Sequence, residues 1–140
     1  GIEGEYAWEM CAPTPHTMLM LDLDKMYGYK LAPLLDDGIP VLIYNGDKDY
    51  ICNWIGGLRW TDALQWTGQL GYQHAPVKEW QASTSGKIAG QTKRFGSLTF
   101  LRVFDAGHMV PMDQPESAES MLLEFMKTGT LKGLEVNVDV

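Results

Sequence analysis

Two short apolar runs, each followed by a polar loop, constrain the fold of this chain more than any other feature. Residues 41–44 are Val-Leu-Ile-Tyr and lead into Asn-Gly-Asp-Lys-Asp, and residues 98–104 lead into Asp-Ala-Gly-His. A continuous apolar run of this length is typical of a strand that is covered on both faces. A helical pattern follows each loop, so the order of strand, loop and helix occurs twice. This alternation predicts an α/β fold with a mostly parallel sheet.

Helices are expected before, between and after these strands. Over residues 24–36 the apolar positions fall on one face of a helix, although Pro33 should kink or shorten it. A second helix is predicted over residues 53–66. A third is predicted to start from a capping box at Asp113 and to end at Gly129.

The remaining segments give weaker patterns. Residues 1–20 have no clear period, so irregular structure is expected there. Residues 77–82 and 88–95 are each rich in strand-forming positions and flank a turn of Ser, Thr and Gly, which predicts a hairpin-like pair of short strands.

Composition excludes several classes of function. The 140 residues carry a net charge of −7 at pH 7, and the 11 Lys and Arg residues are scattered along the chain. A negative protein without a basic cluster is a poor partner for nucleic acid. No apolar run approaches the roughly eighteen residues that cross a bilayer, so no membrane partner is expected.

The two cysteines predict neither a disulfide-built domain nor a local metal site. Cys11 and Cys52 allow at most one internal bridge. Neither has a second Cys or a His at the short separations that zinc sites favour, so no metal and no cofactor is predicted.

Candidate catalytic residues follow the two apolar strands. Ligands and reactants gather beyond the carboxyl ends of the strands in α/β sheets, and Asp49 and His108 lie on loops at those ends. An acid and the histidine that it orients are two of the three members of a hydrolase triad. Spacing alone leaves Asp47 and Asp105 as alternative acids, and by itself it favours a turn-forming Asp and a structural His over a catalytic pair.

A nucleophile is the missing third member of such a triad. In α/β-hydrolases the nucleophile precedes the acid, which precedes the histidine, so the serine is expected upstream of this chain. None of the chain's serines stands in the G-x-S-x-G pattern of a nucleophile elbow; they are Ser83, Ser85, Ser97, Ser117 and Ser120.

Two motifs resemble a known family. Residues 41–54, VLIYNGDKDYICNW, resemble the acid-bearing segment of serine carboxypeptidases of the carboxypeptidase Y and cathepsin A type, and residues 107–111, GHMVP, resemble the histidine segment of that family. The resemblance extends over residues 22–130. It implies that residues 1–140 are the C-terminal part of a single α/β-hydrolase domain whose N-terminal part, with the nucleophile, is absent.

The resemblance also implies roles for five residues. Asp49 is similar to the acid of the triad, and His108 to its general base and acid. Cys52 resembles a free thiol of the pocket on the acyl side of the cut bond, and Met109 resembles a wall of the pocket for the departing residue. Cys11 resembles a cysteine bridged to a partner far upstream and is therefore not expected to pair with Cys52.

The function implied by this resemblance is that of a serine-type carboxypeptidase, which releases C-terminal residues of peptides through an acyl-enzyme. The expected partners are peptide or protein C-termini and the missing N-terminal part of the domain. The expected location is the vacuole or lysosome, or outside the cell. Two alternatives remain open: a serine carboxypeptidase-like acyltransferase and a non-catalytic binding module of the same fold.

Overall fold

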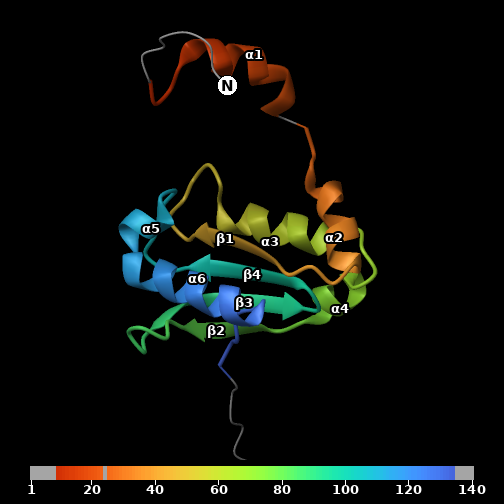
Figure 1. Ribbon diagram of the computed structural model, residues 1–140, viewed down its shortest axis with the longest axis vertical. Helices are drawn as coiled ribbons and strands as arrows, with labels where there is room; N and C mark the ends of the chain where they lie inside the picture. Colours follow the sequence, from red (N-terminus) through yellow and green to blue (C-terminus); the bar gives the residue numbers. More distant parts are fainter. Residues whose placement is uncertain (1–8, 24, 135–140) are drawn as a thin grey trace, which may run out of the picture.

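A four-stranded mixed sheet forms the centre of the computed structural model, which describes residues 9–23 and 25–134 (Figure 1). The strand order is β1-β4-β3-β2. The strands are β1 (Val41–Gly46), β2 (Val77–Gln81), β3 (Ile88–Phe95) and β4 (Leu98–Val103). The β1–β4 pair is parallel, whereas β4–β3 and β3–β2 are antiparallel. The predicted α/β class is confirmed, and within the described sheet its parallel character is confined to the β1–β4 pair.

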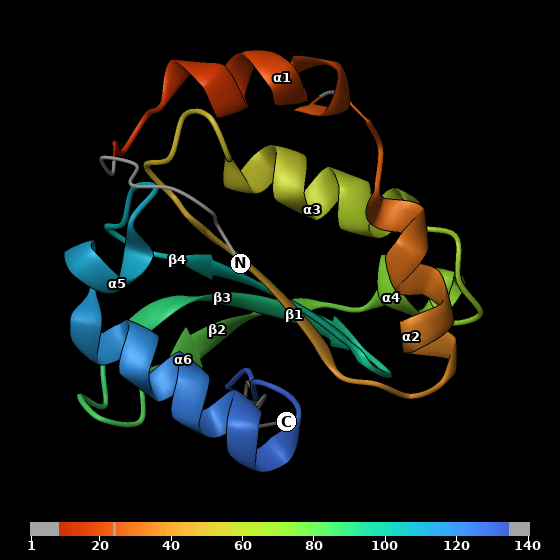
Figure 2. The ribbon, with the colours of Figure 1, turned by 45° about the horizontal axis from the view of Figure 1, so that its top comes forward.

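Helices cover both faces of this sheet, and Figure 2 shows α3 and α6 on opposite sides of it. The helical elements are α1 (Pro13–Leu23), the 3₁₀ turn η1 (Gly28–Leu31), α2 (Ala32–Asp36), α3 (Trp54–Ala63), α4 (Gln69–His74), α5 (Val110–Asp113) and α6 (Pro115–Thr128). No helix among the described residues is long and apolar enough to span a membrane.

Strand β4 contributes to two separate cores because both of its faces are covered. Leu98 and Phe100 pack in one cluster with residues of α2, α3 and α4. Leu101 and Val103 pack in the other cluster with Met121 of α6. Successive side chains of a strand point to opposite faces, so an uninterrupted apolar run fills both cores. The prediction that residues 98–104 form a strand covered on both faces is confirmed.

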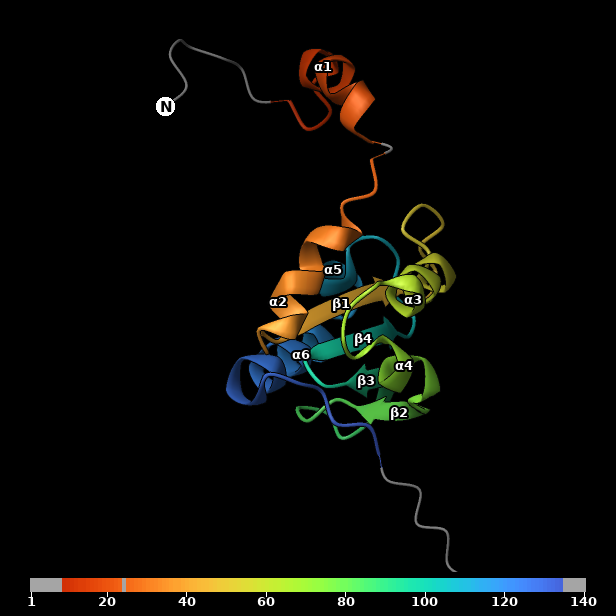
Figure 3. The ribbon, with the colours of Figure 1, turned by 90° about the vertical axis from the view of Figure 1, so that its right-hand side faces the viewer.

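The prediction of irregular structure over residues 1–20 was wrong from Pro13 onward, where α1 begins, whereas residues 9–12 are irregular and residues 1–8 lie outside the described part of the chain. Figures 1 and 3 show α1 apart from the other elements, and Met18 and Leu21 are 78% and 90% exposed. Pro13 and Pro15 lie in the first turn, where a missing N–H costs no intrahelical hydrogen bond. The helix has no apolar stripe that a periodicity argument could detect.

The predicted capping box was also wrong. Gln114, and not Asp113, occupies the N-cap of α6, and it makes no side-chain capping bond. The Asp113 carboxylate instead accepts a hydrogen bond of 2.7 Å from the backbone N–H of Gly107. The end of the helix was predicted correctly, since Gly129 adopts a left-handed conformation with φ 71° at the C-cap.

The helix predicted over residues 24–36 is shortened, which is one of the two effects expected of Pro33, and its α-helical part is α2. Pro33 stands in the first turn of α2, and the segment before it forms η1 rather than α-helix. The predicted hairpin of β2 and β3 is confirmed, with Gly86 at φ 67° in its turn.

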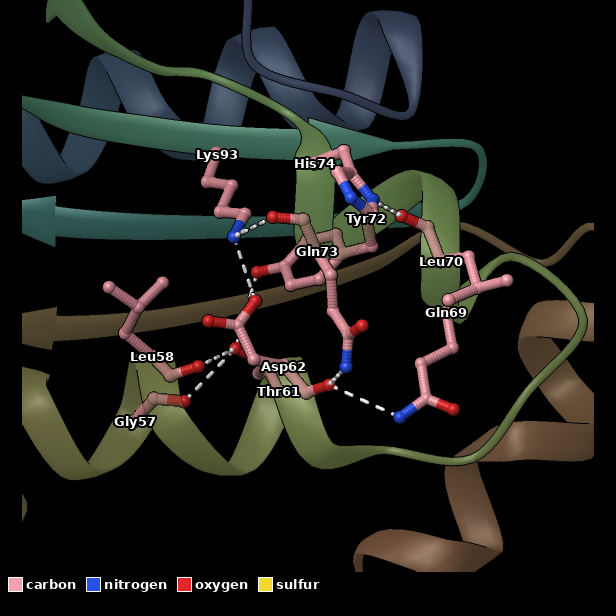
Figure 4. Close-up of polar contacts among 10 residues, drawn as sticks. All are labelled: Gly57, Leu58, Thr61, Asp62, Gln69, Leu70, Tyr72, Gln73, His74 and Lys93. Atoms are coloured by element: carbon pink, nitrogen blue, oxygen red, sulfur yellow. Dashed lines mark hydrogen bonds and ion pairs between the residues drawn. The ribbon is translucent and has the colours of Figure 1, made fainter.

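A partly buried polar cluster fastens α3 and α4 to β3 (Figure 4). The ammonium of Lys93 lies 2.8 Å from a carboxylate oxygen of Asp62 and 3.3 Å from the carbonyl oxygen of Gln73. The Lys93 side chain is 7% exposed. Beside it, burial raises the pKa of Tyr72, whose hydroxyl donates to Thr61 at 3.2 Å. These bonds fix α3, which follows directly after the loop that carries Asp49.

Candidate functional site

The loop after β1 holds Asp49 in a defined orientation. One carboxylate oxygen, Oδ1, accepts hydrogen bonds from the backbone N–H groups of Ile51 at 3.0 Å and Cys52 at 3.1 Å. The Asn45 amide donates to the carbonyl of Cys52 at 2.9 Å, and Asn53 caps α3 by accepting from the Gly56 N–H. Both ends of the loop are therefore anchored, and the second carboxylate oxygen of Asp49 remains available to another partner.

The loop after β4 carries His108 and is tied to the first loop. The backbone N–H of Lys48 donates to the carbonyl of Ala106 at 2.9 Å, and the Lys48 ammonium lies 2.6 Å from Asp105. A Cβ atom at Gly46 would lie 2.3 Å from the Ala106 carbonyl oxygen. The two loops thus approach so closely that only glycine fits at position 46.

Asp49 and His108 are in direct contact. Oδ2 of Asp49 lies 2.9 Å from Nδ1 of His108, and the two side chains are 7% and 66% exposed. The hydrogen bond with His108 lowers the pKa of Asp49 below its ordinary value of 3.8, and the backbone N–H groups of Cys52 and Ile51 act in the same direction, whereas burial opposes them. An ionised carboxylate can only accept a hydrogen bond, so in the neutral imidazole the proton lies on Nδ1 and Nε2 is the acceptor. A pair of this kind can take a proton from a nucleophile and return it to a leaving group.

The alternative acids face other partners. Asp47 lies 3.5 Å from the guanidinium of Arg102, which also stacks over the Trp54 ring at 4.1 Å. Asp105 pairs with Lys48. Among the residues that the structure describes, Asp49 is the hydrogen-bond partner of His108. The structure thus pairs His108 with Asp49, whereas Asp47 and Asp105 pair with Arg102 and Lys48.

The two predicted pocket residues lie beside this pair. Cys52 is an exposed free thiol, and its sulfur, a carboxylate oxygen of Asp49 and a ring nitrogen of His108 lie within 4.8 Å of one another. Met109 follows His108 directly and is 57% exposed. Cys11 is also free and exposed.

Sequence reasoning missed the residues that support the pair. Gly46, Lys48 and Asn45 all lie within or beside the motif at residues 41–54, yet their roles depend on the approach of the second loop. Asp113 was assigned to a helix cap, whereas it holds the loop on which His108 lies.

Known proteins are similar to this chain in sequence. The chain is 48% identical over 101 residues to a vacuolar serine-type carboxypeptidase of Saccharomyces cerevisiae, covering 72% of this chain and 20% of the relative. It is 44% identical over 108 residues to carboxypeptidase Y of the same yeast, covering 77% and 20%. It is 38% identical over 135 residues to serine carboxypeptidase-like 49 of Arabidopsis thaliana, covering 96% and 26%.

A solved structure agrees with these sequence relatives. The crystal structure of a prohormone-processing carboxypeptidase from Saccharomyces cerevisiae superposes with a TM-score of 0.73 at 30% identity, over 93% of this chain and 28% of that chain. The chain spans 20–26% of the length of the three sequence relatives. Residues 1–128 match the family model for serine carboxypeptidases, and the chain belongs to that family.

Proposed function

We propose that the protein containing this chain is a serine-type carboxypeptidase that releases C-terminal residues from peptides through an acyl-enzyme. The observation that carries the proposal is the 2.9 Å contact between Asp49 and His108. It joins the carboxyl ends of two parallel strands in a chain that belongs to the serine carboxypeptidase family. Asp49 is proposed as the orienting acid, and His108 as the general base and acid.

The proposed reaction follows from the free nitrogen of His108. Nε2 accepts the proton of a serine hydroxyl as the serine oxygen attacks the scissile carbonyl carbon. The imidazolium then gives this proton to the nitrogen of the departing residue, the C–N bond breaks and an ester remains. Water repeats the sequence on the ester, which frees the shortened peptide and the serine. Asp49 stays ionised throughout and stabilises the imidazolium.

The serine is proposed to come from the N-terminal part of the same domain. The chain spans only 20–26% of three relatives, and no serine of the chain stands in an elbow pattern. Strand β1 lies at the edge of the described sheet, so its outer edge can pair with a further strand. Residues 1–140 alone are therefore expected to show no peptidase activity.

The substrate side of the site is proposed to include Cys52 on the acyl side of the cut bond and Met109 on the side of the departing residue. Their support is their position beside Asp49 and His108. No cofactor takes part in this reaction. Because one relative is described as vacuolar, we place the protein in the vacuole or lysosome, with secretion as the alternative.

The test is an assay of the complete protein on an N-blocked dipeptide and on the matching C-terminal amide. Release of the last residue from the free acid, with inactivation by a serine-directed phosphonate, supports the proposal. Acyl transfer from an activated ester without peptide cleavage would instead identify an acyltransferase. If the complete protein showed neither activity, the result would support a non-catalytic binding module.

A further inference from the structure

A hollow of about 310 Å³, which we call the α6 hollow, lies where the start of α6 meets the start of β3 and the segment after β4. Neither Asp49 nor His108 lines it. Its volume is at the lower end of the range of about 300–1,000 Å³ that is usual for small-molecule sites. We propose that the α6 hollow binds a free α-amino acid with an apolar side chain.

The N-terminal end of α6 offers hydrogen-bond donors to this hollow. Gln114 makes no side-chain capping bond, and Pro115 has no N–H. The backbone N–H of Ala118 donates to the Gln114 carbonyl at 2.9 Å. The N–H groups of Glu116 and Ser117, in contrast, have no acceptor among the residues that the structure describes. Unpaired N–H groups and the helix dipole at such an end favour an anionic group.

The Ser117 hydroxyl is an independent sign of a ligand. Ser117 lines the hollow and is only 8% exposed. Within the described part of the chain, its hydroxyl has no hydrogen-bond partner. A buried hydroxyl is normally hydrogen-bonded, because leaving it unpaired costs free energy. Together with the two N–H groups, this hydroxyl matches the oxygens of a carboxylate.

Two opposite charges also line the hollow without pairing with each other. Lys87 precedes β3 directly, and Glu116 lies in the first turn of α6. Neither forms an ion pair with any residue in the described ranges. The third charged lining residue, Asp105, is paired with Lys48. A ligand with one negative and one positive charge can therefore find a partner for each.

An α-amino acid meets this requirement, because a single carbon atom separates its carboxylate from its ammonium group. The rest of the wall fits an apolar side chain, since Ile88, Ala89 and Phe104 also line the hollow. Burial of apolar surface there favours binding. A bare oxyanion such as phosphate would satisfy the donors, but it would lie beside the Glu116 carboxylate and leave it unpaired.

The α6 hollow also touches the segment that leads to His108. Asp105 lines the hollow and lies three residues before His108, and its carbonyl accepts a hydrogen bond of 3.1 Å from the Gln114 amide. Free amino acids are what the proposed reaction releases, so the hollow would bind a product of that reaction. This consequence rests on the proposed function, whereas binding of the amino acid does not.

Radiolabelled L-leucine is the probe, and equilibrium dialysis against the complete protein measures its binding. The site variants are Lys87→Gln, Glu116→Gln and Ser117→Ala. Lys127→Gln and Glu119→Gln are the matched controls, because they remove the same charges from positions on α6 that do not line the hollow. Circular dichroism checks that each variant keeps the wild-type fold. N-acetyl-L-leucine, L-leucinamide and inorganic phosphate are the competitors.

The proposal predicts a saturable leucine site of equal affinity in the wild type and in both controls. Affinity should fall at least about tenfold in Lys87→Gln and in Glu116→Gln, since each loses a charged partner, and about two- to tenfold in Ser117→Ala. N-acetyl-L-leucine lacks the ammonium group and L-leucinamide lacks the carboxylate. Each should therefore compete at least about tenfold less well than unlabelled leucine.

An unchanged affinity for leucine in either charge variant would overturn the proposal. Displacement of leucine by phosphate, or equal competition by N-acetyl-L-leucine, would also overturn it, because either result would identify a site for a simple anion. Leucine binding that follows the predicted pattern in a protein without peptidase activity would instead refute the proposed function and leave the amino-acid site standing.

Discussion

The Oδ2 atom of Asp49 lies 2.9 Å from Nδ1 of His108, although 59 residues separate them in the chain. Their contact depends on the register of two parallel strands, in which Gly46 at the end of β1 stands opposite Val103 at the end of β4. Each residue is then carried forward by a loop, and the loops are bonded to each other through Lys48. The geometry of the pair is therefore set within this chain.

Gly46 provides a test of the close approach between the loops. A Cβ atom there would meet the carbonyl oxygens of Ala106 at 2.3 Å and Gly107 at 2.4 Å, and backbone atoms cannot rotate away. We expect Gly46→Ala to lower the free energy of unfolding by about 1–3 kcal/mol and peptide turnover by about a hundredfold.

The control for this substitution is Gly28→Ala. A Cβ atom at position 28 would lie 3.6 Å from the nearest atom, which belongs to the Trp60 ring, and this distance is an ordinary van der Waals contact. Urea denaturation and steady-state kinetics measure the two effects. If Gly46→Ala behaved like Gly28→Ala, the close approach would have no importance for the site.

The lowered pKa of Asp49 predicts how its contribution to stability depends on pH. A carboxyl group whose pKa is depressed in the folded state stabilises that state above its unfolded pKa of about 3.9. This contribution disappears as the pH falls through the lower folded value. The difference in the free energy of unfolding between wild type and Asp49→Asn should therefore be largest at about pH 6 and should shrink at about pH 3.

Urea denaturation of both proteins across this pH range provides the measurement. Asp37→Asn is a matched control, because Asp37 is an exposed carboxylate outside the site. A difference between wild type and Asp49→Asn that stayed constant with pH would be inconsistent with a hydrogen-bonded, ionised Asp49.

The strands could be predicted from the sequence because they depend on local patterns, and the uninterrupted apolar run of β4 indicates burial on both faces. The loops after these strands could be identified in the same way, but the choice of Asp49 over Asp47 and Asp105 depended on the resemblance of two motifs to a family. Helix α1 escaped prediction because its apolar residues are exposed and have no period. The role of Asp113 and the proximity of Cys52 to His108 could not be predicted in this way. Both depend on the three-dimensional path of the loops, which is not determined by local sequence propensity.

Loss of the ion pair between Lys93 and Asp62, which lies away from the site, should lower the free energy of unfolding substantially. Asp62→Ala would leave the Lys93 ammonium with the Gln73 carbonyl as its remaining oxygen partner in Figure 4. Because Asp62 is 34% exposed and water can reach its position, we expect a loss of about 1–3 kcal/mol rather than the full penalty of an isolated buried charge.

The exposed ion pair of Lys48 and Asp105 is the comparison for that effect. Its side chains are 65% and 71% exposed, so Asp105→Ala should change the free energy of unfolding by less than about 1 kcal/mol. Thermal or urea denaturation of Asp62→Ala and Asp105→Ala shows which variant loses more stability. Equal losses would mean that burial of Lys93 does not determine the strength of its ion pair.

The proposal that Asp49 and His108 are catalytic is tested most directly by turnover of an N-blocked dipeptide in the complete protein. Asp49→Asn keeps the shape of the side chain but removes the charge that orients the imidazole, and His108→Ala removes the base. Each should lower kcat by about 10³- to 10⁴-fold or more. Asp47→Asn, two residues away and facing Arg102, should retain activity within about tenfold. A loss in Asp47→Asn as large as that in Asp49→Asn, or near-normal turnover in Asp49→Asn, would contradict this account.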